Sequence, residues 1–161
     1  MAVNQFNLAT HQRAERKLLM TVAEWTEGTT QERELLGRRT EDSSIEYNAD
    51  QSTSTDILGI NYTDINKTQP QQDFDPYLIL GGSKLGAKLN DIRKRNALSE
   101  LSQFTIYVIT GYVGNSVDGY EAEKHVNCTI TYNSLGGDAS VNMPISVFLS
   151  NDITNGTVNK L

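Results

Sequence analysis

Apolar and polar residues alternate along three stretches of the C-terminal half of the chain, with the period of two that is typical of half-buried β-strands. The three stretches are residues 104–113, 124–133 and 139–150. Turn-forming residues separate them at 115–119 and at 135–138. Pro144 lies inside the last stretch, and we expect it at a sheet edge or a bulge because proline cannot donate a ladder hydrogen bond. The pattern predicts a mainly β fold.

An apolar run near the N-terminus, residues 18–25, contains two β-branched residues and is also predicted to be a strand. Residues 14–20 could equally continue a helix. The next segment, 26–38, is interpreted as a connector. Residues 61–76 are predicted to be extended, because each of their two prolines pushes the preceding residue out of the helical region.

One segment, residues 83–98, has the pattern of an amphipathic helix. Leu85, Leu89 and Ile92 are spaced at i, i+4 and i+7 and form a single apolar stripe. Ser83 is a suitable N-cap after a Gly-Gly turn, and three consecutive basic residues occupy the last turn, where the helix dipole favours cations. The sequence therefore predicts one flanking α-helix.

Residues 38–59 have strand-like composition, but few of their side chains require burial. As an extended chain, one side carries Asp42, Ser44, Glu46, Asn48, Ser54 and Asp56, and the other carries Ile45, Tyr47, Thr53, Thr55 and Ile57. Turn-forming residues at 48–51 separate the two arms, so we predict a long β-hairpin over 38–59. Such a hairpin is marginal in water and needs support from outside. A mobile loop is the alternative that composition leaves open.

The length of 161 residues is that of one domain, which we assign to residues 1–161. Residues 1–14 are mostly polar and are interpreted as an N-terminal arm, and residues 151–161 as a C-terminal tail. We find neither a signal-peptide pattern nor an apolar run long enough to cross a bilayer, so we expect a soluble protein made in the cytoplasm.

Charge and cysteine content narrow the function classes. The formal net charge of -6 disfavours binding to nucleic acid through phosphate neutralisation. The single cysteine, Cys128, excludes an internal disulfide and fits a reducing compartment.

No catalytic constellation is present in the sequence. The string GGSKLGAK lacks the Gly-Lys-Ser/Thr ending of a phosphate-binding loop. Glu121 and Glu123 offer carboxylates to a metal, but an exposed charge cluster at a strand start is the commoner arrangement. His11 and His125 are too few for a zinc site with Cys128, and we expect His125 on the polar side of its strand. We predict no enzymatic activity, no cofactor and no metal.

Three segments carry a family resemblance. RRTEDSSIEYNADQSTSTDILG, YTDINKTQPQQDFDPY and KLGAKLNDIRKRNAL, in this order, resemble the major tail (tail tube) proteins of tailed bacteriophages and related prophages. The resemblance covers residues 18–149. Its least generic parts are residues 43–48 with 55–57, and 66–68 followed by 70–72 and 75–76.

The resemblance implies a fold and an assembly. The expected fold is a two-sheet β-sandwich or barrel with one flanking α-helix and a long β-hairpin. Six copies would close into a ring, and rings would stack into a hollow tube that conducts DNA from the virion to the host. The expected partners are further copies of the chain, a tape measure protein and the tail terminator and tail tip proteins. DNA would be a transiting cargo, no membrane would be involved, and the protein would be located in the virion tail.

The resemblance also implies roles for the two sides of the hairpin. The polar side would face the channel, so Asp42, Ser44, Glu46, Asn48, Ser54 and Asp56 are predicted to line it. The other side would make intersubunit contacts through Ile45, Tyr47, Thr53, Thr55 and Ile57. Acidic residues on a channel wall would repel phosphates and let DNA slide.

Three alternatives stay open at the level of sequence. The first is the related tube protein of a type VI secretion or contractile phage-like system. The second is a carbohydrate-binding β-sandwich from a receptor-binding tail component, in which Tyr107, Tyr112, Tyr120 or Tyr132 would stack on sugars. The third is a small metal nuclease using Glu121 or Glu123.

Overall fold

A computed structural model describes residues 14–159 of the chain. The body is an eight-stranded antiparallel sheet, in which β10 pairs with β8 beside the path β2-β1-β7-β8-β9-β6-β3. Its strands are β1 (Leu19–Glu27), β2 (Thr30–Leu35), β3 (Ile45–Glu46), β6 (Gln71–Phe74), β7 (Phe104–Asn115), β8 (Gly119–Tyr132), β9 (Ile145–Phe148) and β10 (Ile153–Val158). The prediction of a mainly β fold is confirmed.

Strand β8 is long because it joins the two parts of the sheet. Its first part pairs with β7 and β10, and residues from Thr129 onward pair with β9. The change of partner occurs beside Asn127, whose φ of 56° is left-handed, and opposite a register shift between Phe104 and Ile106 of β7. A bulge of this kind bends a strand, and here it turns β8 from one set of neighbours to the other.

Helix α1 (Lys84–Arg95) lies within the predicted helical range. The Ser83 hydroxyl accepts a hydrogen bond from the Gly86 backbone N–H (3.2 Å), and Asn96 ends the helix in a left-handed conformation. The apolar stripe of Leu85, Leu89 and Ile92 is fully buried. The chain then continues as a short 3₁₀ helix, η3 (Leu98–Ser102), so the predicted end at residue 98 is three residues too late.

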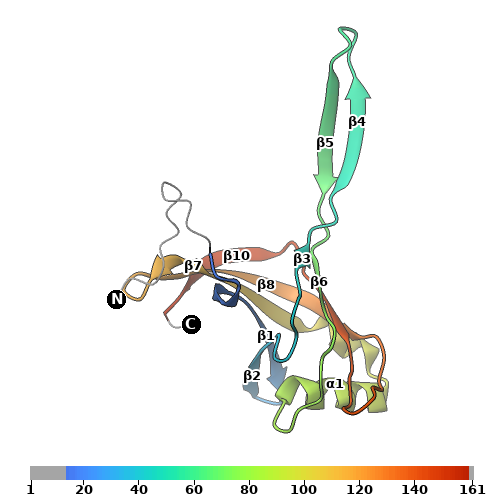
Figure 1. Cartoon of the computed structure of the whole chain (residues 1–161), viewed down its shortest axis with the longest axis vertical. Helices are drawn as coiled ribbons and strands as arrows, with labels where there is room; N and C mark the ends of the chain where they lie inside the picture. Colours follow the sequence, from blue (N-terminus) through green and yellow to red (C-terminus); the bar gives the residue numbers. More distant parts are fainter. Residues whose placement is uncertain (1–13, 160–161) are drawn as a thin grey trace.

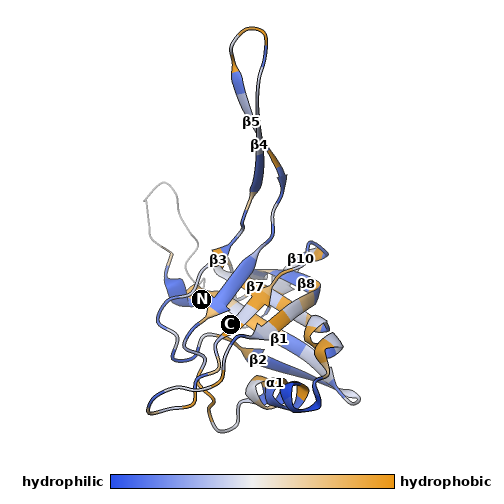
Figure 2. Cartoon of the chain, turned by 90° about the vertical axis from the view of Figure 1, so that its right-hand side faces the viewer, coloured by the Kyte–Doolittle hydropathy of each residue, from blue (hydrophilic) through white to orange (hydrophobic). Residues whose placement is uncertain are grey.

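The hydrophobic core lies between α1 and the sheet. Trp25 of β1 and Phe104 of β7 meet edge to face with ring centroids 6.1 Å apart. Around them, the largest fully buried side chains are Phe74, Leu85, Leu89, Ile92, Ile106, Ile130, Met143, Ile145 and Val147. Figure 2 shows the apolar residues concentrated on the sheet strands and the outer side of the helix largely hydrophilic.

A separate two-stranded ribbon, β4 (Asp50–Thr55) with β5 (Asn61–Lys67), projects far from the body (Figure 1). The predicted pairing of this region is wrong. Residues 38–49 do not form its first arm, because β3 within them pairs with β6 of the body. The chain turns at 56–60 instead of 48–51, so the arms are 50–55 and 61–67. In residues 38–59, only the second predicted arm belongs to the hairpin.

Other segments also differ from the sequence predictions. The connector 26–38 contains β2, and the tail 151–161 contains β10, which pairs with β8. Only the last part of 139–150 is a strand, and Pro144 lies immediately before it. Most of the predicted N-terminal arm, residues 1–13, lies outside the described residues.

Candidate functional site: the projecting hairpin

The hairpin ribbon buries none of its own residues. Every residue of β4 and β5 is exposed, on both faces of the ribbon. Two strands that pack against no other strand or layer bury little apolar area, and this burial is what would offset the entropy of ordering them. Both faces of the ribbon are therefore left uncovered by the rest of the described chain.

Pairing across the ribbon fixes which side chains share a face. Residues directly opposite one another lie on the same face. Thr53 is opposite Thr63, and Ser54 is opposite Tyr62. The predicted separation of Ser54 from Thr53 and Thr55 therefore agrees with the observed strand. Of the other predicted polar residues, Asp56 lies in the turn of the hairpin, and Asp42, Ser44, Glu46 and Asn48 precede the ribbon.

A single carboxylate organises the turn of the hairpin. Asp56 Oδ1 accepts hydrogen bonds from the backbone N–H groups of Leu58 (2.8 Å) and Ile60 (3.0 Å), and its Oδ2 accepts one from the Tyr62 hydroxyl (3.1 Å). The bonds from Ile60 and then Leu58 lower the pKa of Asp56 below its ordinary value. Gly59 supplies the positive φ of 79° that the turn requires. Asp56, predicted to line a channel, thus holds the turn.

The locked turn presents three apolar side chains to solvent. Ile57 is fully exposed, Leu58 is 78% exposed and Ile60 is 49% exposed. We call these three residues the apolar tip. Figure 2 shows this tip in orange above mostly hydrophilic strands. Burying one such side chain contributes roughly 1.5–3 kcal/mol, so an ordered, exposed cluster indicates a contact surface.

The base of the ribbon is tied to the body. The Gln69 backbone N–H donates to the Tyr47 carbonyl (2.7 Å), and the Asn48 side chain donates to the Gln69 carbonyl (3.0 Å). Below this point β3 pairs with β6, and β6 pairs with β9. A register shift between Asp50 and Gln51 lies where the ribbon leaves this base.

The remaining predicted hairpin residues lie in this base or before it. Asp42 and Ser44 are exposed in the segment that precedes β3, and Glu46 is opposite Gln71 of β6. Ile45, predicted to contact a neighbouring subunit, is half-buried against the core of its own chain. Tyr47 is 58% exposed. The structure therefore does not bring the six predicted channel residues together on one strand face.

Sequence reasoning missed the exposed apolar residues of the hairpin other than Ile57. Leu58, Ile60, Tyr62 and Ile65 are all close to half exposed or more. The signal was present: the string TDILGI has an Asp-x-x-Gly turn between two strand-like runs, which is typical of a hairpin loop. The run at 48–51 has equally strong turn composition and led to the wrong assignment.

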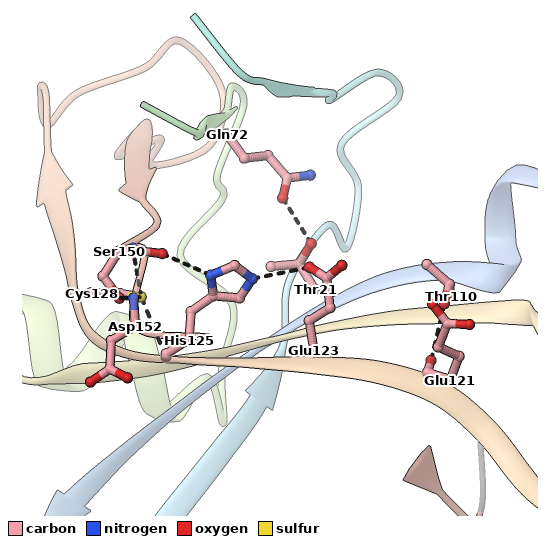
Figure 3. A network of polar contacts seen from close by, with 9 residues as sticks. All are labelled: Thr21, Gln72, Thr110, Glu121, Glu123, His125, Cys128, Ser150 and Asp152. Atoms are coloured by element: carbon pink, nitrogen blue, oxygen red, sulfur yellow. Dashed lines mark hydrogen bonds and ion pairs between the residues drawn. The ribbon is translucent and has the colours of Figure 1, made fainter. Parts of the chain in front are cut away.

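The body contains a buried polar network beneath β6 (Figure 3). His125 is 3% exposed, with Nδ1 2.9 Å from the Ser150 carbonyl and Nε2 3.2 Å from a Glu123 carboxylate oxygen. The expectation that His125 lies on the polar side of its strand is thus wrong. Nearby, the Thr21 hydroxyl donates to the Gln72 side-chain oxygen (2.8 Å).

The network has the properties of a structural rather than a nucleophilic site. Cys128 Sγ contacts the His125 carbonyl (3.4 Å), and burial raises the pKa of its thiol, which disfavours the reactive thiolate. Within residues 14–159, no group of three His, Cys, Asp or Glu side chains is arranged to hold a metal ion. In the same range, no helix combines the length and apolar character of a membrane span.

A second polar cluster crosses three strands on the other side of the sheet. Arg33 of β2 donates to the carboxylate of Glu24 in β1, and its guanidinium lies 5.9 Å from the ring centroid of Tyr107 in β7. Glu24 is buried, and its hydrogen bond and charge raise the pKa of Arg33. Every partner is satisfied locally, so the cluster cross-links strands.

Sequence comparisons find no protein-family model and no curated protein that matches the chain. Solved structures do match its fold. The anti-feeding prophage cap (AFP tube terminating cap) aligns with 98% of this chain and 100% of its own, with a TM-score of 0.54 and 14% identity. A chain of the sheath–tube complex of an extracellular contractile injection system (PVC, extended state) aligns over 88% and 90%, with a TM-score of 0.50 and 14% identity.

The fold is therefore similar to that of chains from these two tube assemblies. The AFP cap alignment covers 98% of this chain, so it takes in the body together with its projecting ribbon. At 14% identity the likeness describes the fold alone, and function has to be argued from the hairpin.

Proposed function

We propose that this chain is a structural subunit of a phage-tail-like contractile injection system, and that copies of it associate through the projecting hairpin to form a tube or its end. The observation that carries the proposal is a ribbon with every strand residue exposed, ending in an ordered apolar tip. Such a feature gains stability only when another surface covers it. The likeness to structures from tube assemblies supports the same role.

The finer architecture proposed is rings of six copies that stack. Strands β2 and β3 are each paired on one side only in the described sheet, so each leaves a row of backbone groups without a strand partner. Closing a ring sets such edges against neighbouring copies and removes the risk of open-ended aggregation. Pairing of the β2 and β3 edges between copies would form a ring, and the hairpin would then make the contacts between stacked rings.

The system itself is proposed to be contractile, because the PVC chain with a similar fold comes from an extracellular contractile injection system. A DNA-conducting tail tube in a virion is the runner-up, with a tape measure protein and tail terminator and tip proteins as partners in that case. The six polar residues predicted to line a channel stay a prediction, with Asp56 serving the turn in addition.

A second candidate is a tube-terminating cap. The AFP cap alignment, which covers 98% of this chain and all of that one, favours it. A tube subunit would elongate alone at high concentration, whereas a cap would stop at a closed ring and bind to one end of tubes made by another protein.

Negative-stain imaging and sedimentation of the purified full chain test the proposal. We expect rings, or rings stacked into tubes. Rings that never elongate over a wide concentration range select the cap. A compact monomer at high concentration with no ring in images contradicts both candidates.

A further inference from the structure

A groove of about 480 Å³ lies on the body near the base of the ribbon, and no side chain in residues 14–159 fills it. Its volume is within the range of roughly 300–1,000 Å³ that is typical of ligand pockets. Leu35, Leu36 and Phe74 contribute apolar side chains to its wall. Leu35 is 44% exposed, whereas Leu36 and Phe74 are 7% and 2% exposed, so Leu35 is the most accessible of the three.

Hydrogen bonds hold the wall of the groove in place. Arg16, in η2 (Arg16–Leu18), donates from its guanidinium to the Leu19 and Ser43 carbonyls, both at 2.7 Å. The Thr40 hydroxyl donates to the Pro76 carbonyl (2.8 Å). The loop between β2 and β3 is thereby fixed to the body, and the groove is formed without a partner.

The groove and the hairpin carry opposite charge. Three basic side chains and one acidic side chain line the groove: Arg16, Lys17, Arg38 and Glu41. Residues 50–67 of the hairpin contain Asp50, Asp56 and Asp64 with Lys67 as their single basic residue. Arg16 and Arg38 form no salt bridge with any other described residue, whereas Lys17 pairs with Glu15 (2.9 Å).

The tip and the groove are complementary in a second respect. The tip is a narrow apolar projection next to the Asp56 carboxylate, and the groove is an apolar hollow next to Arg16 and Arg38, which form no salt bridge within residues 14–159. The ribbon carries its tip away from the body (Figure 1), and β4 alone extends it by about 20 Å. A chain therefore cannot place its tip in its own groove.

We propose that the apolar tip of one copy docks into this groove of a second copy, with Ile57 and Leu58 against Leu35, Leu36 and Phe74 and the hairpin acids near Arg16 and Arg38. The inference rests on the proposed self-association and names its two contacting surfaces. The contact joins two different surfaces, so it repeats from copy to copy, as stacking requires.

Site-directed crosslinking tests the contact in assembled full-length protein. Leu58→Cys and Leu35→Cys variants are mixed, assembled and treated with a short bismaleimide. The natural Cys128 is 1% exposed and does not compete. We expect a covalent dimer from the mixture and none from either variant alone. Leu58→Cys mixed with Val117→Cys is the matched control, because Val117 is an 86% exposed residue in the turn between β7 and β8.

Complementation gives an independent readout. Leu58→Asp removes the tip and keeps the groove, and Leu35→Asp does the reverse. Each change should raise the concentration needed for stacking by at least about tenfold. Mixed together, they should form one junction and give a species of two units, while Val117→Asp stacks normally. Arg38→Glu serves as a second groove variant, because Arg38 is exposed and its replacement does not disturb the core.

The outcomes separate this inference from the proposed function. Wild-type tubes without a Leu58–Leu35 crosslink overturn the inference and leave the tube role standing. A crosslink that forms only after removal of residues 1–13 also overturns it, because the chain's own N-terminal segment is then the occupant. Wild-type protein that stays monomeric in images overturns the proposed function itself.

Discussion

At the scale of single residues, Asp56 shows how one side chain turns a flexible sequence into an ordered surface. Its carboxylate accepts hydrogen bonds from two backbone N–H groups and one hydroxyl. The neighbouring apolar side chains have no acceptor to offer these donors. The sequence TDILGI contains the Asp and Gly that this turn needs. The sequence does not show that residues 48–51, which have equal turn composition, lie at the base of the ribbon and lead into β4.

The first prediction concerns this carboxylate. Asp56→Ala should speed amide hydrogen exchange of Leu58 and Ile60, because their N–H groups lose their acceptor. The thermal unfolding midpoint should change little, since the turn lies outside the core. Exchange measured by NMR in a non-assembling form checks it, with Asp64→Ala as the control. Unchanged exchange at both amides would contradict the role given to Asp56.

The same group gives the turn a pH dependence. The folded pKa of Asp56 is lowered from 3.8, so protons bind the unfolded turn more readily than the folded one. The stabilisation is therefore complete above that value and is lost as the pH falls below it. We expect the Leu58 and Ile60 amides to lose protection on acidification, and Asp56→Asn to remove this pH dependence. A protection profile that Asp56→Asn leaves unchanged would assign the titration to another group.

The buried thiol of Cys128 supports a prediction about its chemical reactivity. Burial raises the pKa of its thiol, so the thiolate is scarce near neutral pH and the sulfur is also shielded. Native protein should react with a thiol reagent at least about tenfold more slowly than protein in denaturant, and a colorimetric thiol assay checks this. Equal rates in the two states would show that the region around β8 opens readily.

At the scale of elements, sequence reasoning succeeded where a segment's own pattern decides its structure. Helix α1 has its apolar stripe and its Ser83 cap within one short segment. Strands β2 and β10 were missed because their charged and polar residues do not read as strand, and both are ordered by pairing with distant strands, β1 and β8. The groove is equally invisible in sequence, because its wall joins residues as far apart as Arg16 and Phe74.

We expect the elements of the body to determine stability and the hairpin to determine assembly. One pair of substitutions tests this. Leu89→Ala, in the buried stripe of α1, should lower the free energy of unfolding by about 2–5 kcal/mol through lost transfer energy and a cavity. Leu58→Ala, in the exposed tip, should stay within about 0.5 kcal/mol of wild type and still weaken stacking. Denaturant unfolding and sedimentation measure the two effects. A strongly destabilised Leu58→Ala would mean that the tip packs within its own chain.

At the scale of the whole molecule, the chain consists of a body with its own hydrophobic core and a ribbon that projects from it without one (Figure 1). The core residues belong to the body, and none comes from β4 or β5. This division explains why a mainly β body with one helix could be inferred from alternation and the apolar stripe, whereas the use of the hairpin could not. The partner surface proposed for it lies on another copy, and a single sequence contains no pairing information between copies.

Replacing residues 51–66 with an Asn-Gly turn that joins Asp50 to Lys67 tests the division. The body should fold with an unfolding midpoint within a few degrees of wild type, because no core contact is removed. Closed rings should still form, and stacks should not. Circular dichroism and imaging check both parts. Loss of the folded body would show that the ribbon supports the sheet, and normal stacks would show that another surface joins the rings.

The ribbon leaves the body toward one end of the long axis, and α1 lies toward the other (Figure 1). Any stack joined through it inherits a direction, because the tip and the groove are different surfaces, so one end of the stack presents unoccupied tips and the other end presents unoccupied grooves. Addition of subunits at the two faces is then chemically distinct, with separate rates and separate inhibitors. A short peptide with the sequence of the tip would block growth at one face only and leave the other free to elongate.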